Sequence, residues 1–273
     1  MDSFIGFDSA WTDSAKAPGA ICAVHVADRA VFVPPVLARF GQALDFVLRH
    51  ASSDGVTLIG IDQPTVVPNE TGSRPVDRVA ASVMSWLGGA VQPAFRGRRG
   101  MFCDAAPIWS FLAALDAVED PERARIADRG VFVMEVYPTL ALATLHATSG
   151  QRRGGAKYNP VNRLFRPDDW IAVSQAAARE ARSLSCEGMA AWCERCAALP
   201  HPRKADQDRL DAVLCALIAM RWRLGSRAAS VLVGDTRTGY MVAPASSSVR
   251  IRLVAAVERL RAATGVCVAI DGQ

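Results

Sequence analysis

Short apolar runs separated by turn residues mark the beginning of the chain. Residues 4–7, 19–26 and 30–36 are apolar runs, and the polar pair Asp28-Arg29 separates the second run from the third. Two apolar runs that meet at a polar pair are typical of a β-hairpin. We therefore predict three strands at the start of the chain, the second and third of which form a hairpin.

The pattern then changes from strand to helix and back to strand. Residues 37–50 carry apolar side chains three to four positions apart, a spacing that predicts a helix with one buried face. Residues 56–61 form an uninterrupted apolar run, which predicts a buried strand. The expected order over this part of the chain is strand, strand, strand, helix, strand.

Two later segments are rich in turn residues and interrupt a mixture of helices and strands. Residues 67–99 begin with Pro, Asn, Gly and Ser, and we interpret them as an insertion over one face. Residues 151–167 are rich in Gly, Pro, Asn and Arg, which predicts a loop. Apolar spacing predicts the remaining elements, namely helices over 76–87, 108–115, 139–146, 168–199 and 208–224 and strands over 130–138, 231–233 and 240–242.

Composition narrows the class of protein. Of 273 residues, 51% are hydrophobic, a content that excludes a disordered chain, and no collagen or coiled-coil period is present. The length suits one elaborated domain, and no linker or internal repeat divides it. We therefore expect a single domain over 1–273, with insertions at about 67–115 and 147–200. The net charge of +4 permits a polyanionic partner without requiring one.

Cysteine use and hydropathy point to a soluble, cytoplasmic protein that does not bind membranes. The seven cysteines are an odd, scattered set without the density of a disulfide scaffold, so we expect reduced thiols. The chain opens with Met1-Asp2-Ser3, which is unlike a signal peptide. Its apolar runs are shorter than the roughly 18 residues that a membrane span needs.

Several acidic residues lie where buried apolar elements end, or inside such an element. Asp8 ends the first predicted strand, Asp62 ends the fourth, Glu135 lies in the last central strand, and Asp211 interrupts an apolar helix. Asp208 precedes Asp211 by three positions and therefore shares its helix face. Buried carboxylates are unfavourable unless they are paired or bind a metal. Oxygen ligands of this kind suit Mg²⁺ or Mn²⁺.

Each acidic residue also has a purely structural interpretation. An aspartate after a strand commonly serves as a turn residue or helix N-cap, and Asp208 alone suits the start of a helix. The joint pattern of strand-end, strand and helix carboxylates favours the metal site, and the structural alternative stays open.

Six short motifs then occur in a characteristic order across almost the whole chain. They are Gly6-Phe7-Asp8-Ser9-Ala10-Trp11, Gly60-Ile61-Asp62-Gln63-Pro64, Arg74-Pro75-Val76-Asp77-Arg78, Glu135-Val136-Tyr137-Pro138, Asp208-Arg209-Leu210-Asp211-Ala212 and Gly239-Tyr240-Met241-Val242-Ala243-Pro244. In this order they resemble domain-of-unknown-function family 429, whose members are described as predicted RNase H-like nucleases.

The resemblance implies an α/β, RNase H-like fold, in which three antiparallel strands precede parallel strands and helices flank the sheet. In that superfamily the catalytic metals bind at positions that correspond to Asp8, Asp62 and Asp211. Asp208 matches a position where related Holliday-junction resolvases carry an acidic or imidazole group. Glu135 is distinctive of the smaller family, and we expect it to orient water or substrate.

Basic residues are candidates for contact with substrate phosphates. Arg74 and Arg78 lie in the first insertion, although an internal ion pair at a helix start explains them equally well. Lys157 precedes Tyr158, which offers one aromatic ring for base stacking. Gln63 stands where relatives commonly have Ala, and we expect it to alter the rim of the site. Other cations occupy Gly-rich loops, where they either follow a nucleic-acid backbone or are simply solvated, namely Arg96, Arg98, Arg99, Arg152, Arg153, Arg163 and Arg166.

A zinc site is a weaker alternative for another part of the chain. Cys193 and Cys196 have the spacing of a ligand pair, with Cys186 upstream and His201 downstream. The segment has the pattern of an Ala-rich helix, however, whereas such a pair normally lies on a turn. Ordinary thiols are the favoured interpretation.

The leading hypothesis is a metal-dependent nuclease, a hydrolase that acts on nucleic acid through Mg²⁺ or Mn²⁺. One alternative is a binding module on the same fold that lacks turnover. Another is a hydrolase of small phosphate esters or nucleotides, which the two insertions would favour if they cap the site. The sequence does not distinguish DNA from RNA and gives no oligomeric state.

Overall fold

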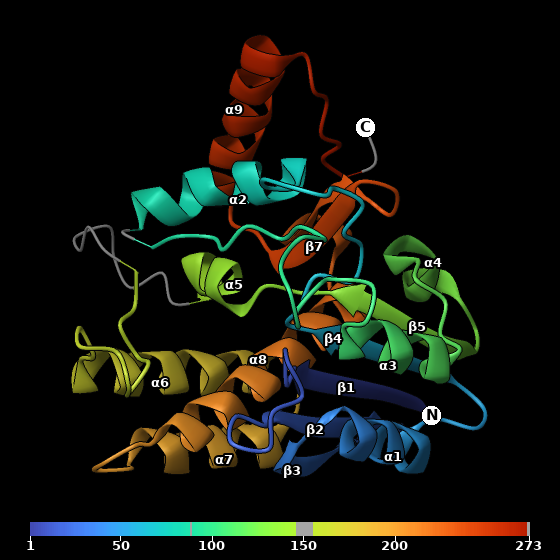
Figure 1. Cartoon of the computed structure of the whole chain (residues 1–273). Helices are drawn as coiled ribbons and strands as arrows, with labels where there is room; N and C mark the ends of the chain where they lie inside the picture. The colour runs from blue at the N-terminus through green and yellow to red at the C-terminus, as the bar shows by residue number, and fades with distance from the viewer. Residues whose placement is uncertain (88, 146–154, 272–273) are drawn as a thin grey trace.

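A mixed sheet of five strands forms the centre of the protein (Figure 1). The computed structural model describes residues 1–87, 89–145 and 155–271. The strand order is β3-β2-β1-β4-β5, in which the β1–β2 and β2–β3 pairs are antiparallel and the β1–β4 and β4–β5 pairs are parallel. This is the predicted RNase H-like layout, and the predicted fold class is confirmed. The strands are β1 (Asp2–Asp8), β2 (Gly19–Val26), β3 (Ala30–Ala38), β4 (Val56–Ile61) and β5 (Gly130–Glu135).

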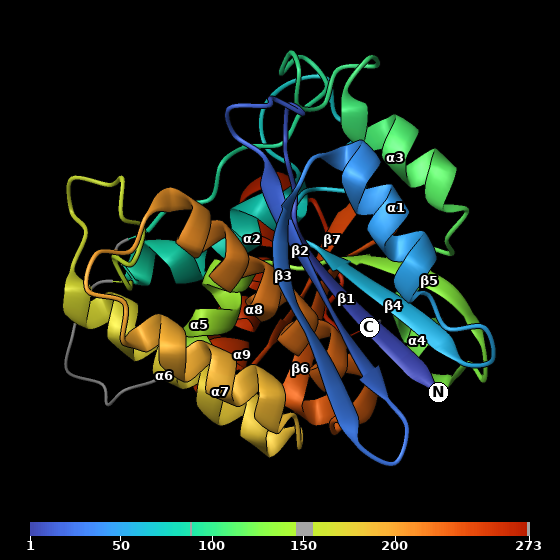
Figure 2. The same cartoon turned by 90° about the horizontal axis from the view of Figure 1, so that it is seen from below.

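Helices cover both faces of this sheet (Figure 2). α1 (Phe40–His50) and α3 (Pro107–Leu115) lie on one face, and α8 (Lys204–Leu224) lies on the other. Two antiparallel helices, α6 (Pro167–Ser183) and α7 (Glu187–Ala197), pack beyond α8 and help to bury it. Residues 210–220 of α8 are therefore all buried, which is why this part of the helix is apolar on nearly every side.

The alternation of side chains along the strands divides the core in two. Phe4 and Leu58 pack in the larger core with α8, whereas Ile5 and Ile59 pack in a second core with α1 and α3. Successive side chains of a strand point to opposite faces. The continuous apolar runs of β1 and β4 therefore reflect strands that are buried on both faces.

The remaining elements form a second group beyond the edge strand β5. β6 (Ser230–Asp235) and β7 (Gly239–Pro244) form the predicted hairpin, and Val136 joins it to the end of β5 through a bridge to Val242. α2 pairs with α9, which projects from the molecule in Figure 1. The helices of this group are α2 (Pro75–Trp86), α4 (Pro121–Ile126), α5 (Pro138–Leu145) and α9 (Ser247–Thr264), with a short 3-10 turn at Arg227–Ala229.

The observed boundaries depart from the predicted ones in a few places. The first helix begins at Phe40 and not at Leu37, because β3 continues through Ala38 and stays paired with β2. α4 and α9 were not predicted. Capping residues signal α9 in retrospect, since the side chain of Ser246 accepts a hydrogen bond from the Val249 amide and Gly265 ends the helix with a positive φ.

Within the described ranges, no helix is both long enough and apolar enough to cross a membrane.

Two glycines allow α8 to lie directly on the sheet. Gly6 of β1 and Gly60 of β4 are paired across the two parallel strands. A Cβ atom on Gly6 would lie 2.0 Å from the carbonyl oxygen of Ala212, and one on Gly60 would lie 2.8 Å from that of Cys215. The backbone of α8 therefore occupies the space of both missing side chains, and no larger residue fits without moving the helix.

We predict that Gly6→Ala lowers the free energy of unfolding by about 3 kcal/mol, because the new methyl group forces α8 away from β1. Urea denaturation measures this change. Gly41→Ala is the matched control, since its Cβ has no neighbour within 4 Å and a glycine in a helix is less favourable than alanine. Equal stabilities of the two variants would contradict the close contact between α8 and Gly6.

Candidate active site

Two aspartates meet at one edge of the sheet, at the carboxyl ends of β1 and β4. Asp8 is the last residue of β1, and Asp62 directly follows β4. The Asp62 amide donates to the carbonyl of Phe7 at 2.9 Å, which continues the parallel ladder. Since side chains alternate, both carboxylates point to the same face as Gly6 and Gly60, which is the face that α8 covers.

α8 supplies two further carboxylates to this group. Asp211 directly precedes Ala212, the residue whose carbonyl lies over Gly6. The contact of α8 with β1 therefore also fixes the position of Asp211. Asp208 lies one helical turn earlier on the same face. Asp8 and Asp211 are only 8% and 5% exposed, and both belong to the set that the sequence predicts as metal ligands.

Loss of water and mutual repulsion raise the pKa values of these carboxyls. Burial raises the pKa of Asp8 well above its usual value, and the charges of Asp211, Asp62 and Asp208 raise it further. For Asp62 the pKa is also raised well above the usual value, by desolvation, then by Asp211 and Glu135. Burial raises the pKa of Asp211 to about 6. The four aspartates of this carboxylate cluster therefore interact electrostatically.

Hydrogen bonds are distributed unequally within the carboxylate cluster. Tyr158 donates its hydroxyl to one oxygen of Asp211 at 2.7 Å, and the amide nitrogen of Gln207 donates to the other at 2.7 Å. The ammonium group of Lys204 pairs with Asp208. Within the described part of the chain, no donor reaches the carboxylates of Asp8 and Asp62. The strand aspartates thus retain free oxygen atoms, whereas the helix aspartates are held in place.

Two residues of this site, Lys204 and Gln207, were not predicted, and Tyr158 was predicted in another role, as a ring for base stacking. Lys204 and Gln207 precede Asp211 by seven and four positions, so helix periodicity places all three on one face and offers a signal that could have found them. Tyr158 is separated from Asp211 by 53 positions, and no local pattern reveals their contact. The Tyr158 ring is buried, which removes it as a surface for base stacking.

The donor chemistry of the cluster suits a hard divalent cation, but the present side-chain orientations do not enclose one. Across residues 1–87, 89–145 and 155–271, no three His, Cys, Asp or Glu side chains are arranged so that they could hold a metal ion. The side-chain oxygen of Gln207, whose amide nitrogen binds Asp211, is buried without a hydrogen-bond partner among the described residues. A cation would satisfy this oxygen and those of the carboxylates after rotation of the side chains.

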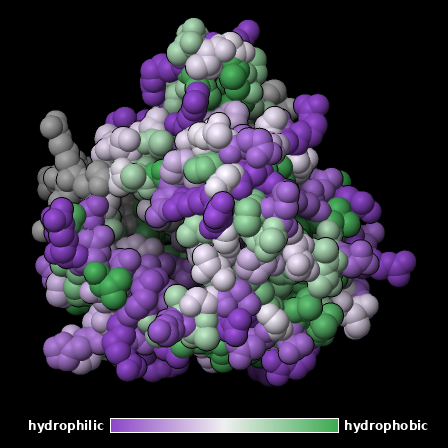
Figure 3. All heavy atoms as spheres, viewed as in Figure 1, coloured by the Kyte–Doolittle hydropathy of each residue, from purple (hydrophilic) through white to green (hydrophobic). Residues whose placement is uncertain are grey.

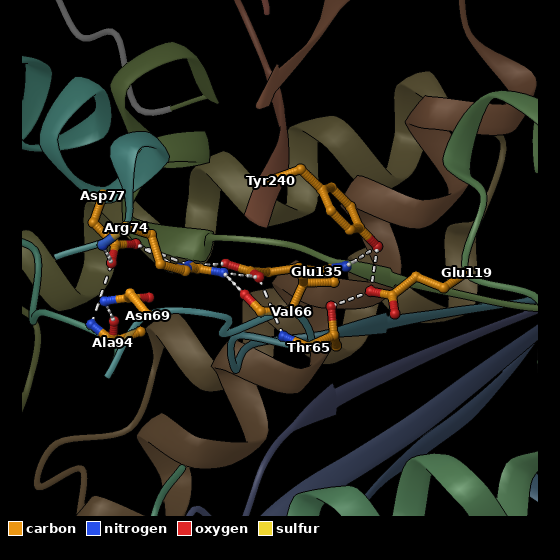
Figure 4. Close-up of polar contacts among 9 residues, drawn as sticks. All are labelled: Thr65, Val66, Asn69, Arg74, Asp77, Ala94, Glu119, Glu135 and Tyr240. Atoms are coloured by element: carbon orange, nitrogen blue, oxygen red, sulfur yellow. Dashed lines mark hydrogen bonds and ion pairs between the residues drawn. The ribbon is translucent and has the colours of Figure 1, made fainter. Parts of the chain in front are cut away.

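Glu135 lies in a separate buried network (Figure 4). Arg74, which is 0% exposed, donates to both oxygens of Glu135 at 2.7 and 2.6 Å. The same guanidinium donates to Asp77 at 2.8 Å and to the carbonyl of Val66 at 3.0 Å. Of the two interpretations of Arg74, this geometry favours the internal ion pair over contact with a substrate phosphate, because its N–H groups already have acceptors.

A second acid and a tyrosine extend this network toward β7. The Glu135 amide donates to the hydroxyl oxygen of Tyr240 at 3.1 Å, and that hydroxyl donates to Glu119 at 3.0 Å. Thr65 donates its hydroxyl to the same oxygen of Glu119 and its amide to Glu135 at 3.2 Å. The network therefore joins the segment after β4 to β5, α2 and β7, and it fixes the chain that follows Asp62.

The other residues that were predicted to contact substrate or to line the site differ in their burial. Arg78 is exposed on α2, and Lys157 is half-buried with its amide donating to Asp169 at 2.8 Å. Gln63, which was expected at the rim of the site, is buried and accepts from the Ser9 hydroxyl at 2.5 Å. Arg152 and Arg153 lie outside the described residues.

The proposed zinc ligands do not come together. Cys186, Cys193 and Cys196 are buried within or beside α7, whereas His201 is exposed. Burial raises the pKa of Cys193 well above its usual value, which disfavours the thiolate that zinc requires. All four residues are described, and they form no group that could hold a metal.

Comparison with known proteins identifies the family. A family described as "Protein of unknown function (DUF429)" matches residues 6–238, which is most of the chain. The chain belongs to the DUF429 family. No curated protein and no solved structure matches it. The matched range of this DUF429 protein includes the whole carboxylate cluster and ends before α9.

The raised pKa values predict how the stability of the DUF429 protein depends on pH. An acid whose pKa is raised by folding binds more protons in the native state, so the free energy of unfolding falls as pH rises between the unfolded and folded pKa values. For Asp211 this window runs from 3.8 to about 6. In EDTA we expect Asp8→Asn to stabilise the protein by about 1–2 kcal/mol at pH 8, because one repelling charge is removed.

Urea denaturation at pH 8 measures this effect, with Asp28→Asn as the control in an exposed turn. A less stable Asp8→Asn variant would show that the Asp8 carboxylate has a structural role and would refute the expected repulsion.

The buried network predicts a large effect of Arg74. We expect Arg74→Met to lower the free energy of unfolding by about 3–5 kcal/mol, because Asp77 and Glu135 would lose their counterion in the interior. Thermal or urea denaturation at pH 7 measures this loss. Arg78→Met, on the exposed side of the same helix, should change stability by less than about 0.5 kcal/mol. Similar values for the two variants would contradict the assigned ion pairs.

Proposed function

We propose that this DUF429 protein is a metal-dependent phosphodiester hydrolase that acts on nucleic acid. The observation that supports this best is the carboxylate cluster, in which Asp8 and Asp62 at the ends of adjacent parallel strands share one interacting group with Asp211 of α8. Carboxylates are rarely gathered in this way without a compensating cation, because their repulsion opposes folding. The resemblance of the family to RNase H-like nucleases points to the same chemistry.

Asp8, Asp62 and Asp211 would hold Mg²⁺ or Mn²⁺, which lowers the pKa of a bound water and stabilises the leaving oxygen of a phosphodiester. The chain's own residues have supporting roles. Tyr158 and Gln207 fix the carboxylate of Asp211.

Lys204, whose side chain is 48% exposed beside Asp208, places a cation near the cluster that can attract a phosphate. The salt bridge from Arg74 to Glu135 holds the segment after Asp62 and acts through positioning.

One observation favours a second candidate, a hydrolase of small phosphate esters or nucleotides. Tyr158 brings the segment after α5 against Asp211, and Gln63 donates to the carbonyl of Met101 in the segment between α2 and α3 at 3.4 Å. The second predicted insertion therefore contributes a residue to the carboxylate cluster, and the first contacts the residue that follows Asp62. Segments packed this close to a site restrict the width of a substrate, which suits a single strand or a nucleotide better than a duplex.

Cleavage assays with Mn²⁺ or Mg²⁺ test these proposals. We expect the protein to cleave at least one of a panel of single-stranded, duplex, hybrid and branched nucleic acids. Asp8→Asn and Asp211→Asn should reduce the rate by more than about 100-fold, because each removes a carboxylate ligand. Asp45→Asn, on the exposed face of α1, is the matched control and should retain the rate.

The panel also contains a chromogenic phosphodiester and cyclic nucleotides. Cleavage of these alone would favour the second candidate. Activity that is equal in the Asp8→Asn/Asp211→Asn double variant and the unmodified protein would reject both. Calorimetric titration with Mn²⁺ provides an independent readout, because loss of binding in the double variant is expected without any substrate.

A further inference from the structure

A groove between α2 and α9 lies outside the carboxylate cluster. The two helices pack side by side through one buried stripe of α9 that includes Val249 and Leu253. Next to this stripe they leave a cavity of about 410 Å³, a volume in the range of small-ligand sites. The residues that line this α2–α9 groove are Ser82, Ser248, Ile251, Arg252, Ala255 and Arg259.

The charge of the α2–α9 groove is positive. Two arginines and no carboxylate line it. α9 carries four arginines and one acid, Glu258. Among the arginines of α9, Arg250 forms an ion pair with Asp271, whereas Arg252 and Arg259 have no carboxylate partner among the described residues. The groove therefore presents two guanidinium groups to an anion, with the hydroxyls of two serines beside them.

An aromatic ring adjoins one of these cations. Trp86, the last residue of α2, is 43% exposed, and the guanidinium of Arg252 lies 3.8 Å from the centre of its ring. Ile251 adds an apolar side chain that is 69% exposed. At the top of Figure 3, where α9 projects, hydrophobic and hydrophilic side chains are exposed side by side. Exposed aromatic rings next to cations are how proteins bind single strands, because bases stack while phosphates are neutralised.

We propose that the α2–α9 groove binds a segment of single-stranded nucleic acid, with Arg252 and Arg259 on its phosphates and Trp86 on a base. The inference rests on the proposed function, since it supplies a second contact for the same class of substrate. α2 spans 12 residues, or about 18 Å, from Pro75, which follows Arg74 of the buried network, to Trp86 at the groove. One rigid helix thus connects the groove with the chain that positions Asp62.

Binding is tested without cleavage, in EDTA, by the fluorescence anisotropy of labelled oligothymidine and oligouridine of about 20 nucleotides, longer than a single binding site. We expect Arg252→Gln/Arg259→Gln to weaken binding about tenfold near 0.1 M salt. The slope of log K against log salt should fall by about 1.4, because two phosphate contacts are lost. Arg29→Gln/Arg129→Gln removes the same charge from two exposed turns and should bind like the unmodified protein.

The aromatic contact is tested in the same assay. Trp86→Leu should weaken binding, whereas Trp86→Phe should retain most of it, because stacking needs a flat ring. Circular dichroism melting of each variant excludes loss of fold as the cause. Equal binding by Trp86→Leu and the unmodified protein would remove Trp86 from the proposal.

Other outcomes overturn the proposed groove while leaving the hydrolase testable. Equal affinity of the Arg252→Gln/Arg259→Gln variant and the arginine control would show that strands bind elsewhere. A dimer in sedimentation that these two substitutions dissociate would identify the groove as a contact between two copies of the chain. The Asp8→Asn/Asp211→Asn variant should keep its affinity for oligonucleotides in EDTA, so failure of cleavage and failure of groove binding are distinguishable.

Discussion

The contact of α8 with Gly6 and Gly60 determines how close a helix can approach the sheet, and the position of every carboxylate in the cluster depends on it. Each glycine lies two positions before an aspartate, on the same strand face. Where the helix backbone replaces two side chains, Asp8 and Asp62 come to lie beside Asp211, the residue before Ala212. The absence of two Cβ atoms is therefore as important for the site as the presence of its acids. The close approach of α8 to the sheet therefore determines both the packing of the helix and the positions of the carboxylates.

The buried carboxylates of this protein are compensated in two different ways. In the carboxylate cluster, Tyr158 and Gln207 hold Asp211 and Lys204 neutralises Asp208, whereas no donor from the described residues reaches Asp8 or Asp62. In the buried network, Arg74 compensates Glu135 and Asp77 with direct hydrogen bonds. The first arrangement is the one that the proposed function uses to bind a cation, and the second is internally satisfied and stabilises the fold. Buried acidic residues thus have different roles in the two places because their hydrogen-bond partners differ.

The modest net charge of +4 conceals an uneven distribution. Negative charge gathers at the carboxyl ends of β1 and β4, and positive charge gathers on α9, whose Arg252 and Arg259 line the α2–α9 groove. α9 lies outside residues 6–238, the range in which this chain matches the DUF429 family. α2 belongs to both regions, because its first turn joins the buried network and its last residue adjoins the groove. α2 therefore links the part of the chain that matches the family to the α2–α9 groove, which includes residues outside the matched range.

The sequence alone determined the strands of the central sheet and the acids at their ends, because both leave local signals. Apolar runs of strand length end at Asp8 and Asp62, and Asp208 and Asp211 share a helix face by spacing. The tertiary structure alone decided which residues act together over long separations. The contact of Tyr158 with Asp211, the burial of Arg74 against Glu135 and the pairing of Trp86 with Arg252 join residues that no periodicity connects. Periodicity reports which face of one element is buried, whereas partners across elements depend on how the whole chain packs, and that is why these contacts could not be predicted.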